Sequence, residues 1–306
     1  TLNYLSLYLT AFLEKKEIQN MDAWEIRVIV ENVMHEYMRQ YVSDANGDYI
    51  VFEEATGCIT IENPKLKKRW HIARKDQNNL GFVQDIYCWI RRTLIQQISA
   101  NESVVLLHGA CVSFHGVACL VLGEKRMGKS YLTNHLMFKK HWSYVAADQT
   151  IVTGKEDGTI YARGNITSYR MEEKDFDLYE KEACRELIYF RQDDRYVHKN
   201  GKINLPPAFL ETYFHVSSTQ DVILKHVIIL SKQKYDLERM QEEKRIELVT
   251  KYVLHDSVEN STSKNTQNHS DKNNLVRAIV KNCNVVSFSS GFSFEMLYDC
   301  LMHQKV

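Results

Sequence analysis

Apolar positions in the first hundred residues follow two different periods. They recur every three or four positions in AWEIRVIVENVMHEYMRQY (Ala23 to Tyr41) and in FVQDIYCWIRRTLIQQI (from Phe82), and this spacing predicts two helices. They alternate with polar positions in DYIVFEEATGCITIEN, which is broken at Thr56-Gly57 and predicts a pair of strands. We therefore expect residues 1–100 to form a small α+β domain that supports or presents a substrate.

Closely spaced strand patterns begin after Asn101. The predicted order is a strand VVLLHGACVSF, a turn at His115-Gly116, a strand VACLVLG, a polar loop, a helix from Lys129 to about Lys139, and strands SYVAADQTIV and TIYARG. Strands that alternate with a helix in this way indicate an α/β fold. We expect this second domain to span residues 101–306.

The C-terminal third adds further elements. HVIILS (His226 to Ser231) predicts a buried strand, KYDLERMQEEKRIELVTKYVL an amphipathic helix, and VVSFSSGFSF a last strand. The polar segment from His255 to Asn274 has almost no apolar side chains and is predicted to be a mobile loop. The pair Pro206-Pro207 is rigid and predicts the start of a helix.

Composition narrows the classes of function. Lys plus Arg and Asp plus Glu both number 39, so the net charge is zero and nothing favours binding to nucleic acid. The apolar runs are far shorter than the roughly 20 residues that cross a bilayer, and no signal peptide is apparent, so we expect a cytoplasmic protein that does not contact membranes. The seven cysteines are scattered and the twelve histidines lack zinc-site spacing, so we expect reduced thiols and no zinc.

The segment from Gly123 to Ser130, GEKRMGKS, matches the phosphate-loop pattern G-x-x-x-x-G-K-[ST]. A loop between a strand and a helix presents backbone N–H groups at the positive end of the helix dipole, where a triphosphate binds. The lysine would neutralise phosphate charge and the serine would bind Mg²⁺. The predicted ATP-binding residues are Gly123, Glu124, Lys125, Arg126, Met127, Gly128, Lys129, Ser130 and Tyr131.

Two further residues are candidates for the same site. Asp148 ends the segment SYVAAD, where an adjacent parallel strand would return to the loop, and we expect it to bind the magnesium ion; the alternative is that it caps a turn or a helix. His108 lies at the far end of the first strand of the predicted hairpin, near the level of the phosphate loop. Its imidazole could contact the γ-phosphate or the acceptor hydroxyl.

The run from Leu106 to Val152 resembles the HPr kinase/phosphorylase family, in which a His-Gly precedes a hairpin, a phosphate loop, a helix and an Ala-Asp-Asp strand end. The helix LIQQISA (Leu94 to Ala100) also resembles HPr-kinase-like proteins of peptide-modifying gene clusters, which carry an N-terminal domain of about this size. The resemblance implies a P-loop kinase core of the HPr kinase/phosphoenolpyruvate carboxykinase type, with a smaller N-terminal α+β domain.

The resemblance also implies roles for single residues. It assigns the loop residues to ATP phosphates and magnesium, Asp148 to magnesium binding and deprotonation of an acceptor serine, and His108 to the active site. This chain departs from the family at two points: Gln149 replaces the second acid, and IYARG, with Ala162, lacks the glutamate of the Ile-Glu-Ile-Arg-Gly signature of HPr kinases. The second departure weakens the expectation that HPr is the substrate.

Basic residues downstream could brace the transferred phosphate or lie in solvent. They are Arg163, Arg170, Lys199 and Lys202, of which we retain Arg170 as a candidate catalytic residue beside His108, Lys129 and Asp148.

The prediction is therefore an ATP- and Mg²⁺-dependent phosphotransferase that acts on a hydroxyl, in the first place a serine of a peptide or small protein, and that tailors a ribosomally made peptide. Three alternatives stay open: a regulatory HPr-type kinase, a switch that binds ATP without transferring phosphate, and a kinase for a small metabolite. The sequence does not decide whether the chain forms a homo-oligomer.

Overall fold

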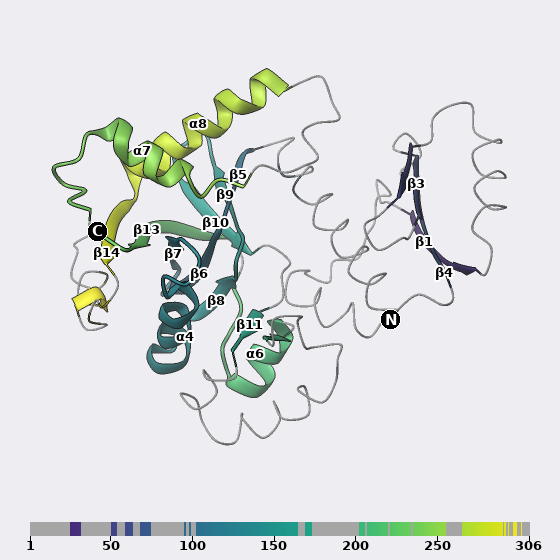
Figure 1. Cartoon of the computed structure of the whole chain (residues 1–306), viewed down its shortest axis with the longest axis horizontal. Coiled ribbons are helices and arrows are strands. Elements are labelled where there is room, and N and C mark those ends of the chain that lie inside the picture. Colours follow the sequence, from purple (N-terminus) through teal and green to yellow (C-terminus); the bar gives the residue numbers. More distant parts are fainter. Residues whose placement is uncertain are drawn as a thin grey trace. The chain divides into compact units, whose positions relative to one another are not determined.

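The computed structural model forms two compact units, and the main division between them falls between Thr93 and Leu94 (Figure 1). The structure describes residues 25–31, 50–53, 59–63, 68–74, 95, 98, 102–164, 169–172, 202–205, 207–219, 221–233, 235–254, 265–289, 291, 293, 296–298 and 301.

The described part of the first unit is a four-stranded sheet in the order β1-β4-β3-β2. Strands β2 (Ile50–Glu53) and β3 (Ile59–Asn63) pair antiparallel, so the predicted strand pair is confirmed. Strand β1 (Glu25–Glu31) pairs parallel with β4 (Lys68–Arg74), so the helix predicted over Ala23 to Tyr41 is wrong for this stretch. The Ile and Val residues of EIRVIVE are β-branched and favour a strand that finds a partner, although their spacing also fits a helix.

The helix predicted from Phe82 falls largely outside the described residues. Ile95 and Ile98 are its described positions, and both are helical.

The second unit contains a mixed sheet in the order β5-β9-β10-β13-β7-β6-β8, and β14 pairs with the C-terminal part of β13. Most neighbouring strands are antiparallel, whereas β13 is parallel to β7 and β14. The strands are β5 (Ser103–Leu107), β6 (Gly109–Phe114), β7 (Val117–Gly123), β8 (Ser143–Ala146), β9 (Thr150–Gly154), β10 (Ile160–Gly164), β13 (Val222–Ser231) and β14 (Asn284–Ser289).

Two strand predictions need correction. The segment VVLLHGACVSF forms two strands that break at His108 and occupy distant positions in the sheet, β5 at one end and β6 near the other. Strand β8, which leads to Asp148, is not adjacent to β7, because β6 lies between them and pairs antiparallel with both. The hairpin β6-β7 itself is as predicted, with Gly109 opposite Leu122.

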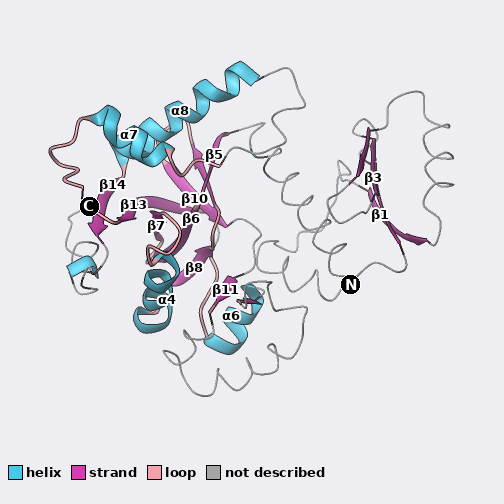
Figure 2. Cartoon of the chain, in the orientation of Figure 1, coloured by secondary structure: helices cyan, strands magenta, loops and turns pink. Residues whose placement is uncertain are grey.

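Helices of the second unit lie beside its sheet (Figure 2). Helix α4 (Lys129–Lys140) contacts β6 and β7, and helix α8 (Asn265–Asn282) contacts β5, β9, β10 and helix α7 (Glu242–Thr250). The apolar residues between the sheet and α7 and α8 form a continuous buried core that includes Val105, Leu120, Ile229, Val249 and Ile279. Helix α6 (Pro207–Phe214) begins at the second proline, as predicted.

The loop predicted over His255 to Asn274 is wrong for its second half, because α8 already begins at Asn265. Leu275, Val276, Ile279 and Val280 are buried against the sheet, and the polar residues before them extend the same helix by further turns. Residues 255–264 lie outside the described part. The long predicted helix after β13 is also shorter than expected, since α7 begins only at Glu242.

Within the described residues, no helix has the length and apolar character needed to cross a membrane.

Candidate functional site

The polar loop between β7 and α4 is shaped by two glycines. At Gly123, a Cβ atom would meet the backbone oxygen of Leu230 in β13 at 2.7 Å, so only glycine fits this close approach. Gly128 has φ 92°, in the left-handed region that glycine enters without strain, and it is the N-cap of α4. The loop therefore turns sharply from a buried strand and opens on a helix N-terminus with no acidic residue in its first turn.

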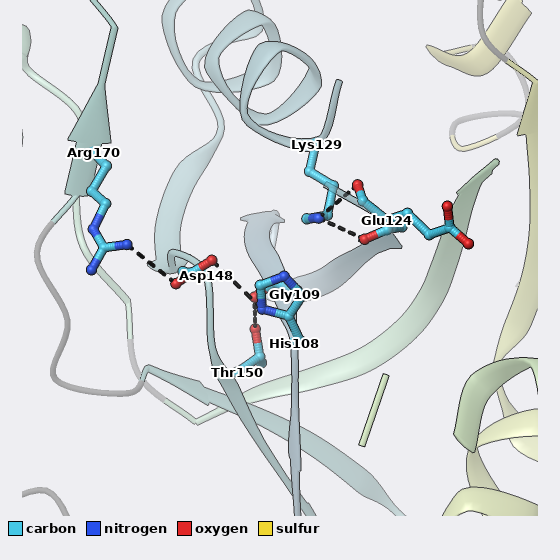
Figure 3. Close-up of polar contacts among 8 residues, drawn as sticks. His108, Gly109, Glu124, Lys129, Asp148, Thr150 and Arg170 are labelled. Atoms are coloured by element: carbon cyan, nitrogen blue, oxygen red, sulfur yellow. Dashed lines mark hydrogen bonds and ion pairs between the residues drawn. The ribbon is translucent and has the colours of Figure 1, made fainter. Parts of the chain in front are cut away.

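The side chain of Lys129 folds back over this loop. Its Nζ donates hydrogen bonds to the carbonyl oxygens of Gly123, at 2.6 Å, and Glu124, at 3.1 Å (Figure 3). Burial lowers the pKa of the Lys129 ammonium below its ordinary value, while the negative charge of Asp148 opposes this shift and the positive charge of Lys202 adds to it. Lys129 thus lies in the electrostatic field of both residues.

The remaining predicted loop residues lie toward solvent. Glu124, Lys125, Arg126, Ser130 and Tyr131 are exposed, whereas Met127 and Gly128 are half-buried. Arg126 has φ 70°, so the loop contains a second residue in the left-handed region, and this one is not a glycine. Backbone strain of this kind is typical of loops whose shape serves a ligand.

Asp148 follows β8 at a tight corner. The N–H of Gln149 donates to the carbonyl oxygen of Ala147 at 2.6 Å, a γ-turn centred on Asp148, and Asp148 itself has φ 63°. The next residue, Thr150, is fully buried and its hydroxyl donates to the carbonyl oxygen of Gly109 at 3.0 Å. This bond fixes the corner to the chain directly after His108.

The carboxylate of Asp148 lies between a histidine and an arginine (Figure 3). His108 Nδ1 is 3.6 Å from Oδ1, and Arg170 Nη1 is 3.6 Å from Oδ2. Both distances are too long for direct hydrogen bonds but within ion-pair range. The side chains are 36% exposed for His108, 42% for Asp148 and 43% for Arg170, so a dissolved molecule can reach all three.

The backbone around His108 is hydrogen-bonded to the segment that follows Thr250. Its N–H donates to the carbonyl oxygen of Tyr252 at 2.7 Å, and Leu254 N–H donates to Leu106 at 2.8 Å. The following Gly109 is required by packing, because a Cβ atom there would lie 2.8 Å from the carbonyl oxygen of Val121. The His-Gly pair therefore marks the point where the chain leaves β5 and enters the hairpin opposite the end of β7.

Three of the four basic candidates downstream lie in the described residues, and they have different partners. Arg170 lies in β11 (Tyr169–Met171), which pairs with β12 (Ile203–Leu205) in a two-stranded ribbon, and Lys202 directly precedes β12. Arg163 instead forms ion pairs with Glu102, at 3.1 Å, and Asp221, away from Asp148. Lys199 lies outside the described residues.

Glu172 was not expected from the sequence and pairs with Lys202 at 2.9 Å. Glu172 and Lys202 flank the paired strands β11 and β12, which no periodic pattern predicts because each strand is only three residues long.

A protein-only metal centre is not present in the described residues, which contain no group of three or more His, Cys, Asp or Glu side chains suited to a metal. Mg²⁺ at a phosphate loop differs from such centres, because phosphate oxygens and water supply most of its ligands. One carboxylate and one hydroxyl suffice from the protein, and Asp148 and Ser130 are of the right chemical type.

The arrangement thus combines a loop of backbone donors, a lysine, an accessible carboxylate and two further cations within one region of the second unit. Cations and N–H groups suit a polyanion, and a carboxylate beside an imidazole suits proton transfer from a hydroxyl.

Comparisons with known proteins add little. No family model matches the chain, and no curated protein is similar to it in sequence. Among solved structures, the HPr(Ser) kinase/phosphatase from Coxiella burnetii aligns with 44% of this chain and 69% of its own, at 13% identity and a TM-score of 0.27. At this TM-score the likeness carries no argument about the fold or the function.

Proposed function

We propose that the chain is an ATP- and Mg²⁺-dependent kinase that phosphorylates a hydroxyl group, in the first place a serine of a peptide or small protein. The observation that carries this proposal is the position of Asp148, whose accessible carboxylate lies 3.6 Å from both His108 and Arg170 and in the electrostatic field of Lys129. A phosphate loop alone would support nucleotide binding, whereas a carboxylate beside it also supports transfer to a hydroxyl.

The phosphates of ATP would lie on the N–H groups between Gly123 and Lys129, at the positive end of the α4 dipole. The ammonium of Lys129 would exchange its carbonyl partners in the loop for phosphate oxygens. Bound magnesium would compensate charge on the phosphates, held on the protein side by Ser130 and Asp148. Because a loose phosphoryl-transfer transition state needs little covalent assistance, positioning and charge compensation supply most of the rate.

The acceptor hydroxyl would approach Asp148 from solvent. Its proton would pass to a carboxylate oxygen of Asp148 as the oxygen bonds to the γ-phosphorus and the bond to ADP breaks. Arg170, on the other carboxylate oxygen, orients Asp148 and offers a cation to the transferred group. Gln149 cannot share the work of Asp148, so a single carboxylate serves both magnesium and the proton.

The acceptor can be identified by label transfer. The purified chain is incubated with γ-labelled ATP, Mg²⁺ and a fractionated lysate of the source organism, and labelled products are resolved by size and by amino-acid type. Phosphoserine in a short peptide would support peptide tailoring. Label in a folded protein of HPr size supports the regulatory kinase instead, and label in a small metabolite supports a metabolite kinase.

Helix α4 contains both the residue to be tested and a control residue. Lys129→Ala should abolish the labelled product, whereas Lys139→Ala, at the exposed far end of α4, should leave it unchanged. Tight ATP binding without any labelled product would contradict the kinase proposal and favour the non-catalytic switch.

A further inference from the structure

The ribbon β11-β12 has one buried and one charged face. Tyr169 and Met171 in β11 and Ile203 and Leu205 in β12 are buried, whereas Arg170 between them is exposed. Glu172 directly follows β11 and Lys202 directly precedes β12, and the alternation of side chains along each strand, continued by one residue, assigns both to the side of Arg170. Because Met171 is opposite Ile203, the next pair outward is Glu172 with Lys202, in agreement with their 2.9 Å ion pair.

This charged face is turned toward the phosphate loop. Arg170 reaches Asp148, and Asp148 also pairs with His108, which directly precedes the Gly109 that lies opposite Leu122 at the end of β7. Arg170 and Lys202 therefore lie on one side of the ribbon, which contacts Asp148 through Arg170, and Lys129 lies at the loop that follows β7. Like charges brought together in a partly buried region repel one another, and an anion between them relieves the repulsion.

We propose that Lys202 is a second phosphate-binding lysine of this site, which contacts the terminal phosphates of ATP, and that Glu172 is the carboxylate with which its ammonium pairs when no phosphate is bound. This inference rests on the proposed function and extends it from the loop to the ribbon. Lys202 would contact the terminal phosphates from the side of Asp148 and Arg170, whereas Lys129 would contact them from the loop. Glu172, 38% exposed, is a partner from which the lysine can turn toward phosphate.

The test measures binding of ATP and of AMP, the latter by competition, at fixed Mg²⁺ and ionic strength. Lys202→Ala should weaken ATP binding by about tenfold to a hundredfold, the range expected for one charge-assisted hydrogen bond. AMP lacks the terminal phosphates, so its affinity should change by less than about twofold. Lys202→Arg should restore ATP binding to within about threefold, because it keeps the charge.

Three further proteins complete the design. Lys244→Ala removes an exposed lysine of α7 and should change neither affinity. Glu172→Gln should alter ATP affinity by less than about threefold, since it frees the ammonium without removing it. If Lys202→Ala lowers Tm, the double variant Glu172→Gln/Lys202→Gln avoids an unpaired carboxylate and should show the same selective loss of ATP.

An unchanged ATP affinity in Lys202→Ala, or an equal loss of ATP and AMP, would overturn the role of Lys202 and leave the kinase proposal standing. Failure of the unsubstituted chain to bind ATP would overturn both, and binding without transfer would remove the kinase proposal alone.

Discussion

Two regions of the second unit meet at the candidate site, and they are built in opposite ways. The candidate phosphate loop from Gly123 to Tyr131 is one continuous stretch, and an anion bound there would meet mostly backbone N–H groups. The acidic corner takes His108 from the start of a hairpin, Asp148 from a γ-turn after β8, and Arg170 from a separate ribbon. The loop therefore depends on shape, and the corner depends on three single side chains.

This difference assigns anion binding to the loop and proton transfer to the acidic corner. A shape made of backbone donors binds an anion but transfers nothing, whereas the corner offers a proton acceptor but no cradle for phosphate. Substitutions in the two regions should accordingly separate ATP binding from phosphoryl transfer.

Asp148→Asn should lower the rate of phosphoryl transfer by about a hundredfold to ten-thousandfold, because the amide cannot accept the hydroxyl proton. ATP binding should change by much less, since the loop is intact. Single-turnover transfer and calorimetric ATP binding measure the two effects. Asp157→Asn, in the exposed turn before β10, is the matched control and should behave like the unsubstituted chain. A parallel loss of binding and transfer in Asp148→Asn would contradict the division of work.

Lys129→Ala should weaken ATP binding by about tenfold to a hundredfold, because one charge-assisted contact to phosphate is lost. Transfer should fall with it. Fluorescence titration with a labelled ATP analogue checks the affinity, and Lys139→Ala provides the reference. Unchanged affinity in Lys129→Ala would mean that the nucleotide does not bind at this loop.

Arg170→Lys should lower transfer by about tenfold at saturating ATP, because lysine keeps the charge but loses the planar donor group. The expected change is in kcat, with little change in KM for ATP. Arg239→Lys, an exposed arginine before α7, is the matched control. A rise in KM for ATP with unchanged kcat would place Arg170 in the nucleotide site instead.

A smaller effect should appear in the pH dependence of ATP binding. The pKa of Lys129 is lowered by burial, so its positive charge is lost at a lower pH than that of an ordinary lysine. ATP affinity of the unsubstituted chain should therefore fall as the pH rises toward 10.5. Lys129→Arg stays charged in this range and should show a weaker decline. Identical pH profiles for the two proteins would show that the charge on Lys129 does not control binding.

The two regions also differ in how far the sequence predicted them. The loop could be found because its residues are consecutive and its glycines follow from elementary steric limits. The approach of His108 to Asp148 was expected only in part: the hairpin register was right, but β6 separates β8 from β7. Strand order depends on contacts between residues far apart in sequence, and local patterns do not encode it.

The spacing of apolar and polar residues misled where tertiary contacts decide the secondary structure. EIRVIVE has apolar residues at helical spacing and still pairs as a strand with β4. Polar residues from Asn265 to Asn274 look like a loop and still extend α8, whose buried end lies on the sheet. Glu172 could not be found at all, because its role follows from a ribbon whose strands are too short for a periodic pattern.

The proposed function requires the phosphate loop and the acidic corner to act together in phosphoryl transfer. The most direct test compares the unsubstituted chain, Lys129→Ala and Asp148→Asn in one experiment that records both bound ATP and transferred γ-label with the same acceptor fraction. We predict binding and transfer for the unsubstituted chain, impaired binding for Lys129→Ala, and binding without transfer for Asp148→Asn. Transfer that persists in Asp148→Asn, or its absence from the ATP-saturated unsubstituted chain, would contradict the account.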